Sequence, residues 1–226
     1  MLNLTKIDTF KYIDNNLLKD INKYGKIITY LEGSTAIDSD QTQQYFYIIL
    51  SGLIKVYQYN PQNNREQTLY LLKQNDMFDV LTVLDGKTHE VMTTALETSK
   101  VLQLPIQKVR EWIETNPEFN KMFYPYMAKQ MRELEELATD ISLYDTSTRL
   151  MKLLLKNIDS KDPIKKFSLL QKLSHEEIAS MIGSVRAVVN RYLQQLKKDG
   201  IIDIKRKKIA INDIHKLLQR VENDYK

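Results

Sequence analysis

The sequence predicts an α+β protein in which an N-terminal antiparallel β-barrel or jelly roll precedes one long helix and a C-terminal winged helix-turn-helix. Three observations support this prediction. Short runs rich in Ile, Val and Tyr alternate with polar turns from Lys26 onward, a long helical pattern follows Pro117, and a capped pair of short helices lies between Ser174 and Gly200. The expected boundaries divide the chain into residues 1–116, 117–145 and 146–226.

Length and composition exclude several classes of protein. The 226 residues suit one large or two small domains, and 42% hydrophobic with 27% charged residues is typical of a soluble globular protein. The chain has no apolar run of about 18 residues and no signal-peptide pattern, so we expect a cytoplasmic protein with no membrane partner. The absence of cysteine excludes disulfides, thiolate nucleophiles, Cys-based zinc sites and iron–sulfur clusters.

The β-rich part begins at Lys26. Its short apolar runs and polar turns predict antiparallel strands of a sandwich or barrel. Gly52 is expected at a bend that needs unusual backbone dihedrals. In the segment before this part, Leu17, Leu18 and Ile21 are expected to face inward.

Two helices are expected after the strands. Ile106 to Thr115 forms a short helical pattern, and Pro117 suits the first turn of a longer helix from about residue 118 to 143. Apolar residues of the longer helix alternate four and three positions apart, as in the seam of a coiled coil. The seam consists of Met127, Met131, Leu134, Ala138 and Ile141. Because it covers only about two heptads, packing within its own domain is an alternative to the dimer interface that we favour.

The helix-turn-helix pattern begins at Ser174, which has capping-box spacing to Glu177. Gly183 supplies the tight turn, and Ser184 is expected to cap the second helix. The expected inward residues of the second helix are Val188, Val189, Tyr192, Leu193 and Leu196. A further amphipathic helix is expected from Thr146 to Ile158.

The residues left on the outward face of the second helix indicate its chemistry. They are Arg186, Ala187, Asn190 and Arg191. Arginine forks match the O6 and N7 acceptors of guanine, and asparagine pairs at two points with adenine, so this face suits the major groove of double-stranded DNA. Two arginines alone are more often simply solvated. Their combination with the cap, the turn glycine and the inward stripe favours DNA binding.

Basic charge is concentrated in the C-terminal part. Residues 147–226 contain 18 Lys and Arg against 9 Asp and Glu, a net +9, whereas the preceding residues carry −5. Such a patch attracts a polyanion but does not distinguish DNA from RNA or an acidic protein. Two β-prone stretches joined by a basic turn predict a wing, whose tip is either solvated or lies against phosphates. The basic turn consists of Lys205, Arg206, Lys207 and Lys208.

The order of these parts resembles the Crp/Fnr family of bacterial transcription regulators, from about Gly25 to Asn212. The most specific residues are Leu173 to Ala179, Ile182, Gly183, Arg186, Arg191, Leu193, Leu196 and Gly200 to Ile202. The resemblance implies a homodimer joined by the long helices, a palindromic promoter site, a cyclic-nucleotide-binding-like sensor domain, and RNA polymerase as a further partner. We expect phosphate contacts from Ser174, His175, Ser184 and the basic turn. Ala187 and Val185 depart from the glutamate and serine usual in the family.

The sensor part departs further from the family pattern. Cyclic-nucleotide members carry a Gly-Glu-Leu segment and an Arg-Ser pair, where this chain has Asp79-Val80-Leu81 and Glu90-Val91. An acidic residue near the phosphate position argues against cyclic AMP. The lack of cysteine argues against an iron–sulfur cluster, and His89 is expected as an exposed loop residue rather than a haem ligand. We therefore expect DNA binding to be controlled either by an unidentified small-molecule effector or by the amount of protein made.

The alternatives to a DNA-binding regulator are an enzyme and a binding module. The three histidines, His89, His175 and His215, lack metal-ligand spacing, and the chain has no nucleophile elbow, P-loop or dinucleotide fingerprint. We therefore expect neither catalysis nor a bound metal. The alternative function is a ligand- or protein-binding β module whose basic C-terminal domain binds RNA or protein rather than specific DNA.

Overall fold

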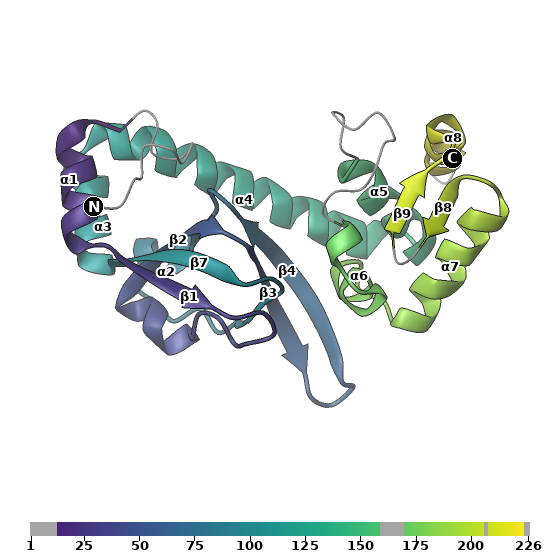
Figure 1. Cartoon of the computed structure of the whole chain (residues 1–226), viewed down its shortest axis with the longest axis horizontal. Coiled ribbons are helices and arrows are strands. Elements are labelled where there is room, and N and C mark those ends of the chain that lie inside the picture. Colours follow the sequence, from purple (N-terminus) through teal and green to yellow (C-terminus); the bar gives the residue numbers. More distant parts are fainter. Residues whose placement is uncertain (1–12, 159–169, 206–207, 224–226) are drawn as a thin grey trace. The chain divides into compact units, whose positions relative to one another are not determined.

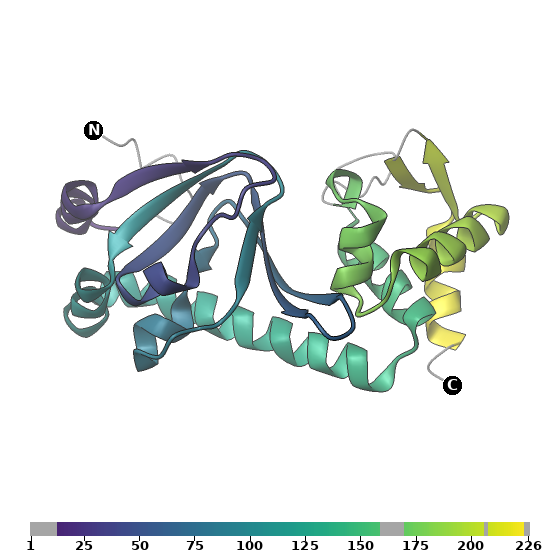
Figure 2. The ribbon, with the colours of Figure 1, turned by 90° about the horizontal axis from the view of Figure 1, so that it is seen from below.

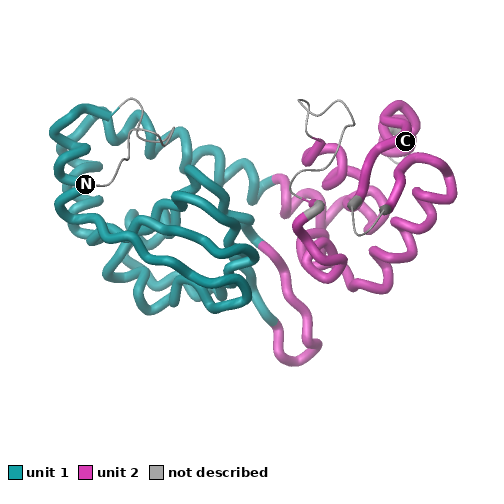
Figure 3. The backbone as a smooth tube through the Cα atoms, viewed as in Figure 1, with its two compact units in different colours: residues 1–59, 69–135 teal, residues 60–68, 136–226 magenta. Residues whose placement is uncertain are grey.

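The computed structural model describes residues 13–158, 170–205 and 208–223 (Figure 1). The chain divides into two compact units, and the division falls within the long helix α4 (Pro117–Leu143). The first unit comprises residues 1–59 and 69–135, and the second comprises residues 60–68 and 136–226 (Figure 3).

Two antiparallel sheets form the centre of the first unit, as Figures 1 and 2 show from two sides. The strands are β1 (Lys26–Tyr30), β2 (Tyr45–Ser51), β3 (Leu53–Asn60), β4 (Arg65–Lys73), β5 (Met77–Phe78), β6 (Met92–Ala95) and β7 (Ser99–Pro105). One sheet has the order β1-β7-β2-β5 and the other β4-β3-β6. The predicted antiparallel β architecture is therefore confirmed.

Strand β2 shows how the sheets are buried. Phe46, Tyr47, Ile48 and Ile49 are all fully buried, although successive side chains of a strand point to opposite faces. Phe46 and Ile48 belong to an apolar cluster shared with helices α1 (Asn15–Tyr24), α3 (Ile106–Thr115) and α4. Tyr47 and Ile49 belong to a second cluster that includes side chains of the other sheet. The four-stranded sheet is thus covered on both faces.

Several predicted features of the first unit are confirmed. Gly52 joins β2 to β3 at φ +94°, where a Cβ atom would come within 2.6 Å of the Ser99 Cα atom. Leu17 and Ile21 are buried on α1, and α3 has the predicted bounds. Helix α2 (Val80–Asp85) and the short 3₁₀ helix η3 (Ser39–Gln43) were not predicted.

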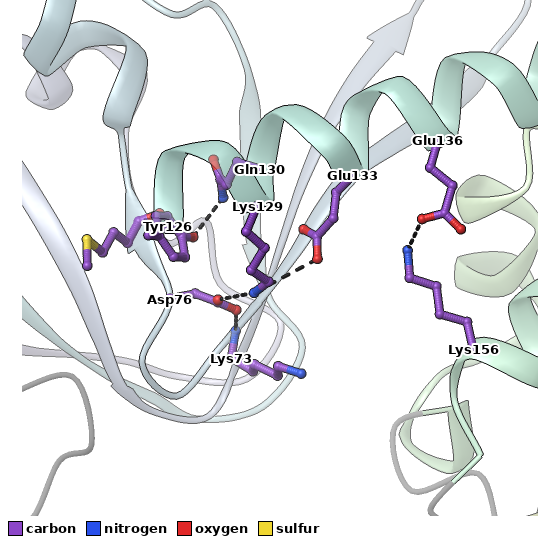
Figure 4. A network of polar contacts seen from close by, with 9 residues as sticks. Lys73, Asp76, Tyr126, Lys129, Gln130, Glu133, Glu136 and Lys156 are labelled. Atoms are coloured by element: carbon purple, nitrogen blue, oxygen red, sulfur yellow. Dashed lines mark hydrogen bonds and ion pairs between the residues drawn. The ribbon is translucent and has the colours of Figure 1, made fainter. Parts of the chain in front are cut away.

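A polar network holds α4 against the turn before β5 within the first unit (Figure 4). The Tyr126 hydroxyl donates to the Met77 carbonyl oxygen at 2.9 Å. Burial raises the pKa of Tyr126, which keeps the phenol protonated and able to donate. Lys129 Nζ lies 3.1 Å from Asp76 Oδ1, and the buried Asp76 also accepts from the Lys73 backbone N–H at 2.9 Å. These contacts join α4 to the turn at Asp76 and to the start of β5.

The predicted seam on α4 is partly exposed. Met131 and Ile141 are 58% and 40% exposed, and Ala138 is also exposed. Met127 and Leu134 are half-buried and pack against the apolar clusters of the first unit. Packing within the domain therefore uses two of the five positions and leaves three on the surface.

The second unit contains the predicted helix-turn-helix and wing. Its elements are α5 (Thr146–Lys156), η4 (Leu170–Lys172), α6 (His175–Met181), α7 (Arg186–Lys198), β8 (Ile202–Lys205), β9 (Lys208–Ile211) and α8 (Ile214–Asn223). Helix α5 is joined to the end of α4 by an ion pair of 2.6 Å between Lys156 Nζ and Glu136 Oε2 (Figure 4) and by a Lys152–Asp140 contact. Helix α8 was not predicted; Leu217 and Val221 are buried on it.

The two helices of the motif begin differently. At α6, the Ser174 hydroxyl accepts from the Glu177 N–H at 3.2 Å and the Glu177 carboxylate accepts from the Ser174 N–H, so the predicted capping box is confirmed. The prediction that Ser184 caps α7 was wrong. Val185 occupies the N-cap and makes no side-chain cap bond, because the turn that contains Gly183 at φ +62° extends one residue further than the pattern suggested.

These caps give a matched pair of variants. Ser174→Ala should lower the stability of the second unit by about 1 kcal/mol, because it removes a cap bond at α6. Ser184→Ala should cost much less, because this hydroxyl caps neither helix. Hydrogen exchange of the α6 and α7 amides in the full chain measures both effects. Equal acceleration of exchange in the two variants would contradict the cap assignment.

Candidate nucleic-acid interface

The orientation of α7 follows from its buried side. Val189 and Leu193 are fully buried and Leu196 is nearly so, and they are matched by buried Ile178 and Ile182 from the α6 segment. Positions three and four apart share one face of a helix, so burial of this stripe fixes the opposite face outward. Val188 and Tyr192, also expected inward, are half-buried.

The predicted base-reading residues lie in two environments. Arg186, Ala187 and Arg191 are exposed, whereas Asn190 is half-buried. The Arg191 guanidinium carbon lies 5.1 Å from the centre of the Tyr192 ring, within the range of a cation–π contact. Three exposed groups on one helix face, two of them cationic, can contact the edges of bases in a major groove.

A hydrogen bond between the two helices was not anticipated. His175 Nδ1, at the start of α6, is bonded to Asn190 Oδ1 on α7. The sequence pattern predicts separate roles for these residues, a phosphate contact for His175 and adenine recognition for Asn190. They are 15 positions apart, so no local spacing could have indicated the pair.

The wing has a regular register but an undescribed tip. Strands β8 and β9 pair antiparallel, with Ile202 opposite Ile211 and Lys205 opposite Lys208. The isoleucine pair is buried and fixes the hairpin to its unit. Arg206 and Lys207 lie outside the described residues. Their contact with phosphates, like that of Lys205 and Lys208, stays a prediction.

Residues 60–68, at the turn between β3 and β4, group with the second unit. Within that unit, the Thr68 and Ser180 hydroxyl oxygens lie 2.7 Å apart, and both residues are buried. The Gln67 amide nitrogen donates to the Met181 carbonyl oxygen at 3.4 Å. The C-terminal end of α6 is therefore in contact with the start of β4.

The segment of the first unit at the expected nucleotide position is built around a buried carboxylate. Asp79 is 3% exposed and caps α2; its Oδ2 atom accepts from the Thr82 hydroxyl at 2.8 Å and lies 3.0 Å from His89 Nδ1. The expectation of an exposed His89 was wrong: its side chain is 18% exposed, because Asp79 supplies a buried hydrogen-bond partner. Arg110 donates to the Thr82 carbonyl oxygen at 2.8 Å, which satisfies the end of α2.

The described residues contain neither a membrane-spanning helix nor a metal-binding group of side chains. No helix among them is both long and apolar enough to cross a membrane. Nor does the same part of the chain contain a group of three or more His, Asp or Glu side chains placed to hold a metal ion.

Comparison with known proteins agrees with this geometry. Residues 148–220 match the model of the Crp-like helix-turn-helix domain, and residues 27–116 match that of the cyclic nucleotide-binding domain. A global nitrogen regulator from Nostoc is 30% identical over 176 residues, which are 74% of this chain and 76% of that protein. A CRP-like cAMP-activated global transcriptional regulator from Mycobacterium tuberculosis is 24% identical over 219 residues, covering 96% of this chain and 97% of that protein.

Solved structures share the fold. A mutant of CooA from Carboxydothermus hydrogenoformans has a TM-score of 0.76 at 22% identity and covers 94% of this chain and 99% of that one. FixK2 from Bradyrhizobium japonicum has a TM-score of 0.73 at 17% identity, with coverages of 88% and 96%. The two domain matches, the similarity to the nitrogen regulator and the shared fold together show that this chain belongs to the Crp/Fnr family of transcription regulators.

Proposed function

We propose that this regulator reads a palindromic promoter site as a homodimer, through the outward face of α7. The observation that supports this most directly is the exposure of Arg186 in the first turn of α7 and of Arg191 on the side of α7 opposite its buried stripe. Each guanidinium can donate two hydrogen bonds to O6 and N7 of a guanine. Ala187 offers only a methyl group, which suits contact with a thymine methyl.

Phosphate contacts supply the sequence-independent part of the affinity. We assign them to Ser174, Ser184 and the basic turn of the wing, whereas His175 is bonded to Asn190. Each Lys or Arg that neutralises a phosphate releases a counterion, so affinity for any duplex should fall steeply as salt rises. These contacts set the register of α7 in the groove but do not select its bases.

We assign the dimer interface to the exposed part of the α4 seam. An exposed stripe of Met131, Ala138 and Ile141 on a single chain is suited to burial against a second copy. A two-fold dimer would present two α7 helices about one turn of DNA apart, roughly 34 Å. This spacing is what a palindromic site requires. RNA polymerase remains the expected further partner, and the cytoplasm the expected location.

We propose that the sensor unit does not bind a cyclic nucleotide. The sequence pattern puts the exposed Glu90 near the phosphate position and the buried Asp79 in the segment that would bind the ribose, and an acidic side chain near the phosphate would repel it. The Asp79 carboxylate already has two hydrogen-bond partners within the chain, the Thr82 hydroxyl and His89 Nδ1. The name of the mycobacterial relative includes activation by cyclic AMP, and we do not expect this protein to share that property. An unidentified effector or the protein concentration would provide control.

The proposed function is tested by selection of duplexes from a random DNA pool with no small molecule added. Enrichment of a palindrome with half-sites one turn apart is expected. Binding that is equal on all duplexes, or preferred on RNA, would instead favour a basic module that binds RNA or protein.

The arginines provide the first prediction about specificity. Arg186→Ala and Arg191→Ala should each weaken binding to the selected duplex by roughly 1 to 3 kcal/mol and binding to a random duplex far less. Arg132→Ala removes the same charge from α4, outside the helix-turn-helix, and serves as the control. Fluorescence anisotropy at fixed salt measures all four proteins, including the wild type. Equal losses on both duplexes would show that the arginines act only as general positive charge.

The dimer assignment gives a second prediction. Met131→Lys should convert the dimer to a monomer in sedimentation, because it places a charge in the seam. It should leave unfolding of the first unit, followed by Trp112 fluorescence, close to that of the wild type, because Met131 is 58% exposed in one chain. Leu134→Lys is a poorer probe, since Leu134 also packs against the first unit. A Met131→Lys protein that stays dimeric would refute the seam.

The third prediction concerns the sensor. Calorimetric titration with cyclic AMP should show no saturable binding, and the nucleotide should leave the affinity for the selected duplex unchanged. Glu90→Gln removes the negative charge near the phosphate position while keeping the side chain's size, and binding of cyclic AMP by this variant would show that repulsion is the cause. Saturable cyclic AMP binding by the wild type would disprove the proposal.

A further inference from the structure

The bond between His175 and Asn190 constrains the DNA-reading face. A side-chain amide oxygen accepts hydrogen bonds and cannot donate them, so the hydrogen lies on His175 Nδ1 and the imidazole is the donor. Both side chains are half-buried, whereas the neighbouring Arg186 and Arg191 are exposed. Asn190 is therefore held by the protein before any DNA arrives.

This bond changes what Asn190 offers to DNA. Two-point recognition of adenine requires the amide oxygen to accept from N6 and the amide nitrogen to donate to N7. In this structure His175 engages one of the two lone pairs of Oδ1, so Oδ1 keeps a single acceptor position, whereas the Nδ2 group has two hydrogens to donate. Nδ2 donates only, and its partners are acceptors: purine N7, guanine O6, thymine O4 or a phosphate oxygen.

We infer that His175 is a positioning residue that fixes Asn190 as a hydrogen-bond donor toward DNA. The inference rests on the proposed DNA-reading function and competes with the adenine contact that the sequence pattern predicts, which Oδ1 could make only through its second lone pair. An acceptor on a base edge would make the pair a determinant of sequence preference. An acceptor on a phosphate would make it a determinant of general affinity.

Matched substitutions separate the role of the bond from that of the side chain. His175→Asn keeps a donor nitrogen close to the position of Nδ1, and His175→Ala removes it. Asn190→Ala removes the side chain that is positioned. His215→Ala, on the exposed surface of α8, is a control for loss of a histidine. Each full-length variant is used in duplex selection and in titration of the site selected by the wild type.

For a base-edge acceptor, His175→Ala should shift the preference at one position of the half-site toward adenine, because the amide is no longer held by His175 and can turn both its atoms toward the base. Its affinity for the wild-type site should fall about 3- to 10-fold, as expected for one hydrogen bond. Asn190→Ala should lose preference at the same position. His175→Asn and His215→Ala should select the wild-type site, with the positions read by the arginines unchanged throughout.

For a phosphate acceptor, His175→Ala and Asn190→Ala should lose the same 3- to 10-fold on every duplex, and His175→Asn should not. A neutral methylphosphonate at the contacted phosphate should then abolish the difference between Asn190→Ala and the wild type. Wild-type affinity and preference in both alanine variants would overturn the inference, as would an equal loss in His175→Asn and His175→Ala. Failure of the wild type to select any site would instead refute the proposed function.

Discussion

The packing of α7 against α6 is the constraint on which the DNA-reading face depends. Val189 and Leu193 have no exposed surface, and Ile178 of α6 is equally buried. A helix turns by a fixed angle per residue, so burial of these positions fixes the directions in which Arg186 and Arg191 leave the backbone of α7. Because buried residues are close-packed, a change of volume among them would rotate or loosen the whole face.

Asn190 lies at the edge of that face, and its environment explains why it differs from the arginines. Residues at the border between core and surface can be held by side-chain hydrogen bonds as well as by packing. His175 provides such a bond from the first turn of α6. The capping box at Ser174 fixes the start of the same helix, so the donor that orients Asn190 is itself positioned by a local backbone interaction. The motif thus depends on a cap, an apolar stripe and one polar bridge between its helices.

How far the sequence predicts this structure depends on how local each signal is. The bounds of α3, the start of α4, the Ser174–Glu177 cap and the bend at Gly52 all follow from residues within a few positions of one another, and the structure confirms them. The burial of His89 and the engagement of Asn190 depend on partners 10 and 15 residues away, which periodicity does not reveal. Helix α8 was not predicted, although its buried Leu217 and Val221 lie four positions apart, as residues on one face of a helix do.

The site residues were more difficult to predict than the fold because exposure is a property of the folded chain. The charge pattern identified α7 and the wing, but Val185 rather than Ser184 proved to be the N-cap. A serine before a helix is a good cap only if the turn ends at it, and the backbone at Gly183 decides where the turn ends. The same limit applies to the seam, since Met127 and Leu134 follow the heptad pattern yet also pack against their own unit.

The polar groups of the first unit show why its control need not resemble that of cyclic-nucleotide regulators. A buried carboxylate is tolerated when hydrogen bonds or a cation satisfy it, and Asp79 and Asp76 are both satisfied by this chain's own donors. Asp76 and the Met77 carbonyl hold α4 through Lys129 and Tyr126, so side chains of the helix itself fasten it to the strands. A signal that altered DNA binding through α4 would act on these contacts.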